Sequence, residues 1–145
     1  MNYLNIELNG IDENGNEKNY KLADFKGKNT IVYFYPEDDT PVCTKEAQEF
    51  RDSENILKDF ARIIGVSSSD INSHKEFQKN HKLNFILLSD IENKLKKTFE
   101  EQNQYITNIH RATFILDKEG KIIKYWGKVD VENHMKEIAD YFGKE

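Results

Sequence analysis

The segment YPEDDTPVCT, residues 35–44, contains the only cysteine of the chain and is the first candidate for chemistry. A thiol acts as a nucleophile only when it is ionised to the thiolate. If Thr40 is the N-cap of a helix, Pro41 is its first residue, where a missing N–H does no harm, and Cys43 lies in the first turn. Backbone N–H groups and the helix dipole favour an anion at that place. The sequence therefore predicts an activated thiol at Cys43.

Ionisation alone would not make a fast enzyme. A thiol with an ordinary pKa of ~8.5 is a few per cent ionised at pH 7, and a pKa of about 6 would raise the reactive fraction roughly thirty-fold, or ~2 kcal/mol. One donor aimed at a developing oxyanion can contribute ~10²–10³ in rate. We therefore expect a cation beside Cys43, and Arg111, at the start of a strand-like segment, is the best candidate. Glu37, Asp38 and Asp39 would oppose the thiolate unless they face solvent or an arginine outweighs them.

Each of these residues also has an ordinary structural interpretation. A lone cysteine is commonly a small buried hydrophobic residue. Thr40 can be only a helix cap, and Pro36 can simply end the preceding strand. Arg111 can be a surface charge at a strand end, and Glu46 can be a first-turn acid that complements the helix dipole. Taken singly, none of these residues decides between structure and catalysis.

The elements that would position Cys43 alternate between strands and helices. Apolar segments predict an N-terminal hairpin and further strands, at residues 5–8, 17–22, 30–35, 61–66, 84–88, 112–116 and 121–126. Three- and four-residue spacing predicts helices from about residue 41 with a break near 52–53, at 70–80 with a cap at Ser69 or Asp70, at 91–100, and from about 131. We therefore expect an α/β, thioredoxin-like fold with a central mixed sheet flanked by helices and an N-terminal β-hairpin. Sites in such sheets gather where strands end and helices begin, which is where Cys43 lies.

Length and composition narrow the class of protein. A chain of 145 residues predicts a single domain, residues 1–145, that can bury roughly 68–70% of its unfolded surface. The net charge of −5, with no Lys/Arg-rich run, argues against nucleic acid as a partner. Apolar stretches fall far short of the ~18 residues of a membrane span, and no secretory signal is visible, so we expect a cytoplasmic protein with no membrane partner. One cysteine excludes an internal disulfide and a Cys-rich zinc site.

Taken together, the residues around Cys43 resemble the signature of a known enzyme family. Pro36, Thr40 and Cys43 spell P-x-x-x-T-x-x-C, which is the active-site signature of the peroxiredoxins. The surrounding sequence resembles that of the bacterioferritin comigratory protein branch, also called the Q-type peroxiredoxins. This similarity covers nearly the whole chain and includes FYPEDDTPVCTKEAQEFRD, LADFKGKNTIVYFYP, IIGVSSSD and RATFILDKEGKI.

The resemblance implies a role for each residue of the signature. Cys43 would be the peroxidatic nucleophile and would become a sulfenic acid. Thr40 would hydrogen-bond the peroxide, and Pro36 would shield the sulfur from water and overoxidation. Arg111 would stabilise the thiolate and polarise the peroxide, and Glu46 would orient Arg111. The implied activity is reduction of hydrogen peroxide and small organic hydroperoxides, with no cofactor and no metal.

One departure from the family pattern concerns regeneration of the thiol. Many members of the branch carry a resolving cysteine five residues after the first, where this chain has Gln48. The chain therefore resembles a one-cysteine version, recycled by thioredoxin, glutaredoxin or a small thiol. The resemblance favours a monomer, with a weak dimer as the alternative. A redox-sensing module that forms a mixed disulfide with a partner protein is the second hypothesis. A dithiol oxidoreductase is disfavoured, because Thr40 and Glu46 stand where a C-x-x-C partner would be.

The histidines give weaker signals. His74 and His81, seven residues apart on one expected helix, are compatible with metal binding but are more typical of packed or surface side chains. His110 adjoins Arg111 and could tune the site, whereas His134 is expected to cap or pack the last helix. The polar segment 100–110 could shape the entrance to the site.

Overall fold

The computed structural model describes residues 2–102 and 108–143, and within them seven strands form one sheet in the order β2-β1-β5-β4-β3-β6-β7. The strands are β1 Leu8–Ile11, β2 Glu17–Tyr20, β3 Thr30–Phe34, β4 Arg62–Ser67, β5 Ile86–Ser89, β6 Ala112–Leu116 and β7 Ile122–Trp126. The helices are α1 Pro41–Leu57, α2 Ile71–His81, α3 Lys94–Gln102 and α4 His134–Gly143, with 3-10 turns at Tyr3–Asn5 and Leu22–Phe25.

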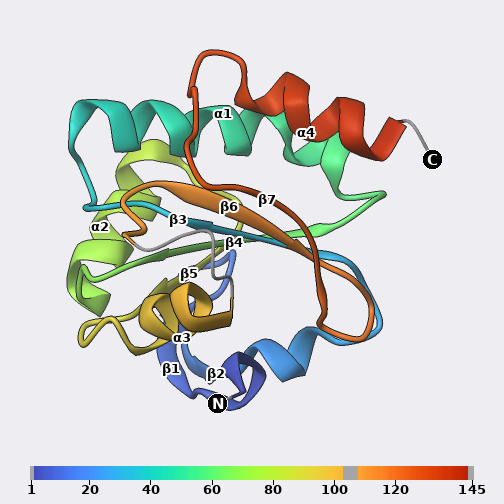
Figure 1. Cartoon of the computed structure of the whole chain (residues 1–145). Helices are drawn as coiled ribbons and strands as arrows, with labels where there is room; N and C mark the ends of the chain where they lie inside the picture. Colours follow the sequence, from blue (N-terminus) through green and yellow to red (C-terminus); the bar gives the residue numbers. More distant parts are fainter. Residues whose placement is uncertain (1, 103–107, 144–145) are drawn as a thin grey trace.

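The sheet is mixed, with a parallel centre and antiparallel flanks. Strand β4 pairs in parallel with β3 and β5, whereas β6 and β7 on one side and β1 and β2 on the other are antiparallel to their neighbours. The parallel strands require helical crossovers, which α1 and α2 provide. This is the thioredoxin-like α/β arrangement predicted from the sequence, and Figure 1 shows the sheet flanked by helices.

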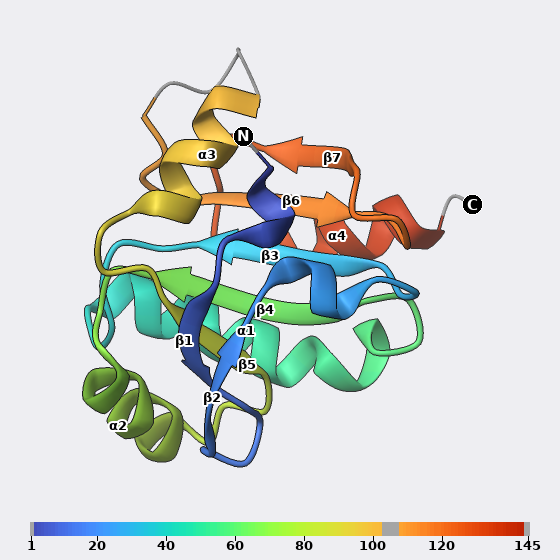
Figure 2. The ribbon, with the colours of Figure 1, turned by 90° about the horizontal axis from the view of Figure 1, so that it is seen from below.

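Helices cover both faces of the sheet. Figures 1 and 2 show α1 and α4 together on one face, with α3 on the other. Along β3, Ile31 and Tyr33 belong to the hydrophobic cluster under α1 and α4, whereas Val32 and Phe34 belong to the cluster under α3. Period-two alternation within an unbroken apolar run is what a strand buried on both faces requires, as predicted for this segment.

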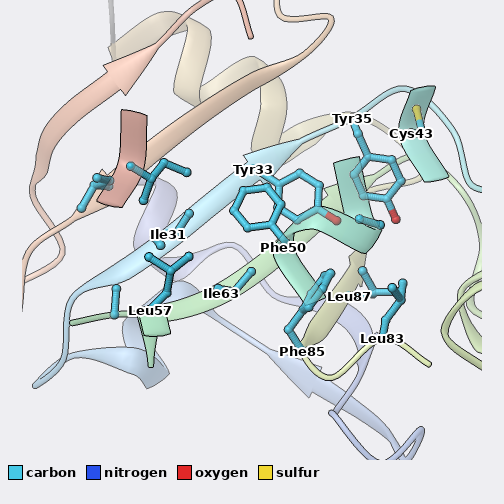
Figure 3. Close-up of a cluster of buried hydrophobic side chains, with 14 of the residues drawn as sticks. Ile31, Tyr33, Tyr35, Cys43, Phe50, Leu57, Ile63, Leu83, Phe85 and Leu87 are labelled. Atoms are coloured by element: carbon cyan, nitrogen blue, oxygen red, sulfur yellow. The ribbon is translucent and has the colours of Figure 1, made fainter. Parts of the chain in front are cut away.

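The cluster on the α1 side extends to the candidate nucleophile. The ring of Tyr33 stacks on that of Phe50, with centroids 4.3 Å apart. Cys43 belongs to the same cluster, and Figure 3 shows it beyond Tyr35 at the end of the row of side chains. The thiol therefore lies at the margin of a packed core, where neighbouring side chains hold it in place.

Two predictions near the start of the chain and in α1 were wrong in detail. The first strand is Leu8–Ile11 rather than 5–8, because the Asn2 side chain accepts the N–H of Leu4 at 2.8 Å and starts a 3-10 turn instead. No break occurs near residues 52–53. The Asp52 carboxylate accepts from Arg51 Nε at 2.9 Å rather than capping a new helix, so α1 continues to Leu57.

The third helix begins later than predicted. Its expected start was residue 91, but α3 begins at Lys94 because the Asp90 carboxylate accepts the N–H groups of Leu95 and Lys96 at 3.1 and 3.0 Å. Asp90 thus satisfies the free N–H groups of the first turn. The remaining strand boundaries lie within two residues of their predicted positions.

Candidate active site

The start of α1 positions Cys43. Thr40 is the N-cap, Pro41 is the first helical residue, and Cys43 lies in the first turn with 1% of its surface exposed. The Thr40 hydroxyl does not cap the helix; it donates instead to the Glu37 carbonyl oxygen at 3.2 Å. The N–H groups at this helix end are therefore left for other acceptors.

Strand pairing brings Arg111 to the thiol from a distant part of the chain. Because β6 is antiparallel to β3 and pairs Ala112 with Phe34, Arg111 lies beside the end of β3. Its Nη2 donates to Cys43 Sγ at 3.3 Å, and its Nη1 donates to Glu46 Oε1 at 2.6 Å. One guanidinium therefore bridges the thiol and a carboxylate that lies three residues further along α1.

Burial sets the electrostatics of this bridge. The Glu46 side chain is 1% exposed, and burial raises its pKa to about 7, although Arg111 acts in the opposite direction. Burial also lowers the pKa of Arg111, but its interactions with Cys43 and Glu46 outweigh that effect and raise the pKa above its ordinary value. Arg111 is therefore a permanent cation, whereas Glu46 changes its charge near neutral pH.

Pro36 lies at the carboxyl end of β3 and is half-buried. With Tyr35, Ser67 and His110 it lines part of a hollow of about 200 Å³. His110 is exposed, and the structure gives it no direct contact with Cys43. Of the polar segment 100–110, residues 103–107 lie outside the described part of the chain.

The acidic loop departs from the prediction at one residue. Glu37 and Asp39 are exposed, but Asp38 is buried, and the side chain beside its carboxylate is a histidine rather than an arginine. Its carboxylate accepts hydrogen bonds from Tyr35 Oη at 2.6 Å and Ser73 Oγ at 2.7 Å, and it lies 2.7 Å from His74 Nδ1. Sequence reasoning missed this pairing, although a signal was present. His74 lies three residues after Ile71 and three before Phe77, which places all three on the inward side of α2.

The other histidines have separate partners. His81 Nε2 contacts Asp39 Oδ1 at 2.8 Å, and His134, which is buried at the start of α4, contacts Thr113 Oγ1 through Nε2 at 2.7 Å. His74 and His81 therefore do not converge on one point. Within residues 2–102 and 108–143, no group of three or more His, Cys, Asp or Glu side chains is arranged to hold a metal ion. No helix in the same residues has the length and apolar character needed to cross a membrane.

Fold and site together define a class: a thioredoxin-like protein with one arginine-bound thiol in place of a dithiol. Residues 3–125 match the AhpC/TSA family, and the chain belongs to that family. Over 125 residues it is 46% identical to peroxiredoxin Bcp of Bacillus subtilis (strain 168), a match that covers 81% of this chain and 79% of that protein.

Other relatives place the chain in the same branch. It is 43% identical over 133 residues to the chloroplastic peroxiredoxin Q of Gentiana triflora, a match that covers 90% of this chain and 60% of the plant protein. The structure of a cysteine-to-serine mutant of Xanthomonas campestris peroxiredoxin Q matches with a TM-score of 0.85 at 26% identity, covering 98% of this chain and 92% of that one. The chain is thus a thiol-dependent peroxidase of the Bcp/Q branch, with a peroxide as substrate and a thiol as reductant. This confirms the predicted enzyme class.

Proposed function

We propose that Cys43 is the residue that reduces the peroxide. The observation that carries the proposal is the 3.3 Å hydrogen bond from Arg111 Nη2 to Cys43 Sγ in the first turn of α1. An adjacent cation favours the thiolate over the thiol. The same guanidinium can also stabilise negative charge that develops on the peroxide during the reaction.

The reaction is a two-electron oxidation of sulfur. The Cys43 thiolate attacks one peroxide oxygen, so that an S–O bond forms as the O–O bond breaks. Sulfur becomes a sulfenic acid, and the leaving oxygen takes up a proton and departs as water or an alcohol. Arg111 and the first-turn N–H groups of Val42 and Cys43, which precede the first intrahelical hydrogen bond at Thr44, would stabilise the leaving oxygen.

Three further residues would prepare the site. The Thr40 hydroxyl hydrogen is donated to the Glu37 carbonyl oxygen, so Thr40 Oγ1 keeps lone pairs that can accept the O–H of a peroxide. Glu46 holds Nη1 of Arg111 and leaves Nη2 for the sulfur. Pro36, which has no N–H and lies two residues after the end of β3, would limit access of water to the thiol.

Regeneration must use an external thiol, because the sequence contains one cysteine and has Gln48 at the position of a resolving cysteine. A thiol would attack the sulfenic acid to give a mixed disulfide and water. A second thiolate would then displace Cys43 and leave as the disulfide. Thioredoxin, glutaredoxin and a small thiol are the proposed classes of donor, and we propose a monomeric, cytoplasmic enzyme.

The test is a single-turnover reaction of the reduced protein with one equivalent of hydrogen peroxide in a stopped-flow instrument. We expect one oxygen atom to be added per chain, at Cys43 by mass spectrometry, and no fast phase in Cys43→Ser. A rate equal to that of free cysteine would refute the proposal. Multiple turnovers with a donor thiol separate the peroxidase from the redox sensor, which would instead give one stable mixed disulfide.

A further inference from the structure

A buried pair of side chains, His74 and Asp38, joins the loop before the proposed nucleophile to α2. The side chains of His74 and Asp38 are 0% and 1% exposed, and Nδ1 lies 2.7 Å from Oδ2. Asp38 is in the loop between Pro36 and Thr40, whereas His74 lies in the first turn of α2. The pair therefore ties this loop to a helix more than thirty residues away in sequence.

The hydrogen-bond partners define the charge of the pair. The Leu88 carbonyl oxygen, 2.9 Å from His74 Nε2, can only accept, so Nε2 carries a proton. Asp38 Oδ2 accepts from Ser73 Oγ and lies 2.7 Å from His74 Nδ1, and a hydrogen bond between that oxygen and Nδ1 requires the proton to be on Nδ1. The pair is then an imidazolium beside a carboxylate, with no net charge.

The charge of Asp38 matters because it lies in the same neighbourhood as the thiol. Burial raises the pKa of Tyr33 well above its ordinary value, and Glu46, Asp38 and Cys43 raise it further while Arg111 lowers it. Geometry gives the same result, because Tyr35 donates its hydroxyl to Asp38 and belongs to the same buried cluster as Cys43. Without a counter-charge, Asp38 would oppose formation of the thiolate.

We propose that His74 is a positioning residue for the peroxidase reaction. It neutralises Asp38, so that Arg111 acts on the Cys43 thiolate without a competing anion from the loop, and it anchors the loop to α2. This inference rests on the proposed function of Cys43.

The experiment is a double-mutant cycle measured by single-turnover oxidation between pH 5 and 10. We expect His74→Leu to shift the pH–rate profile to higher pH and to slow the reaction at pH 7 by about tenfold, the effect of one neighbouring charge. Asp38→Asn added to His74→Leu removes that charge, so the double variant should react faster than His74→Leu alone. Glu76→Gln, on the exposed side of α2, is the matched control and should react like the wild type.

The cycle separates charge from structure. If His74 has a purely structural role, His74→Leu should lower the maximal rate without shifting its pH dependence, and the double variant should react no faster than His74→Leu. Either result overturns the proposal. If His74→Leu does not fold, ¹⁵N NMR of the wild-type protein tests the proposal by measuring the protonation of the two ring nitrogens of His74. Two protonated nitrogens at pH 7.5 support the proposal, and a neutral ring overturns it. Failure of the wild type to oxidise at Cys43 would instead refute the proposed function itself.

Discussion

Replacement of Arg111 by methionine tests the electrostatic core of the site. Two unit charges at the 3.3 Å between Nη2 and Sγ attract by ~5 kcal/mol at an effective dielectric constant of about 20, and by ~1 kcal/mol in bulk water. The Arg111 side chain is only 12% exposed, so the dielectric constant of about 20 describes this site better than that of bulk water. Glu46 shares the positive charge and reduces the attraction. We expect Arg111→Met to lower the rate of Cys43 oxidation by about 10²–10³, the effect of losing one oxyanion donor.

The assay is stopped-flow oxidation by hydrogen peroxide from pH 5 to 10, because the profile separates two effects. If the variant holds less thiolate at neutral pH, the midpoint of the rate against pH moves to higher pH. If the peroxide is less polarised, the rate at high pH, where all of the thiol is ionised, is lower. Arg111→Lys keeps a point charge but loses the planar fork that binds Cys43 and Glu46 together, so its rate should lie between those of the wild type and Arg111→Met.

A control is needed because removal of Arg111 leaves Glu46 buried and without its counter-ion, which can destabilise the protein by itself. The double variant Arg111→Met/Glu46→Gln removes that charge and should recover thermal stability but not the rate. A plateau within about threefold of the wild type in both variants would refute the role of Arg111 in polarising the peroxide.

Three further predictions concern individual residues. Thr40→Val removes the acceptor oxygen and should slow single-turnover oxidation about tenfold, the effect of one hydrogen bond of about 1.5 kcal/mol. Because the pKa of Glu46 rises from its ordinary 4.5 to about 7, the native state holds this proton more tightly than the unfolded state. The free energy of unfolding should therefore fall by about 3 kcal/mol from pH 4 to pH 8 relative to Glu46→Gln, as measured by urea titration; parallel pH profiles would contradict this. Phe50→Ala, at a fully buried ring, should lower that free energy by about 3–5 kcal/mol, and a loss below ~1 kcal/mol would contradict the packing.

The strands and the thiol were predictable from local sequence, but their pairing was not. The apolar run of β3 and the proline at the start of α1 each identify an element without reference to the rest of the chain. Arg111 reaches Cys43 only because β6 pairs with β3, and local sequence does not specify which strands pair. The need to stabilise a thiolate predicted a cation, and the resemblance to peroxiredoxins supported Arg111. Neither predicted the register in which β6 pairs with β3.

Asp38 shows where local reasoning fails. Three consecutive acidic residues are typical of an exposed loop, and two of them are exposed. Whether the middle one is buried depends on the packing of α2, which begins more than thirty residues later and supplies both Ser73 and His74. The capping box of an isolated helix can be predicted from adjacent residues, but a buried ion pair between distant elements cannot.

The charges around Cys43 have to be considered together, because each one changes the others. Arg111 is shared between the thiol and Glu46, so an ionised Glu46 uses part of the positive charge that the thiolate needs. With its pKa raised to about 7 by burial, Glu46 carries only part of a charge near neutral pH, which limits that competition. An uncompensated Asp38 would add a further anion, and one guanidinium would then face a thiolate and two carboxylates. Pairing with His74 removes this excess, and so an acidic loop can lie beside a thiolate without suppressing it.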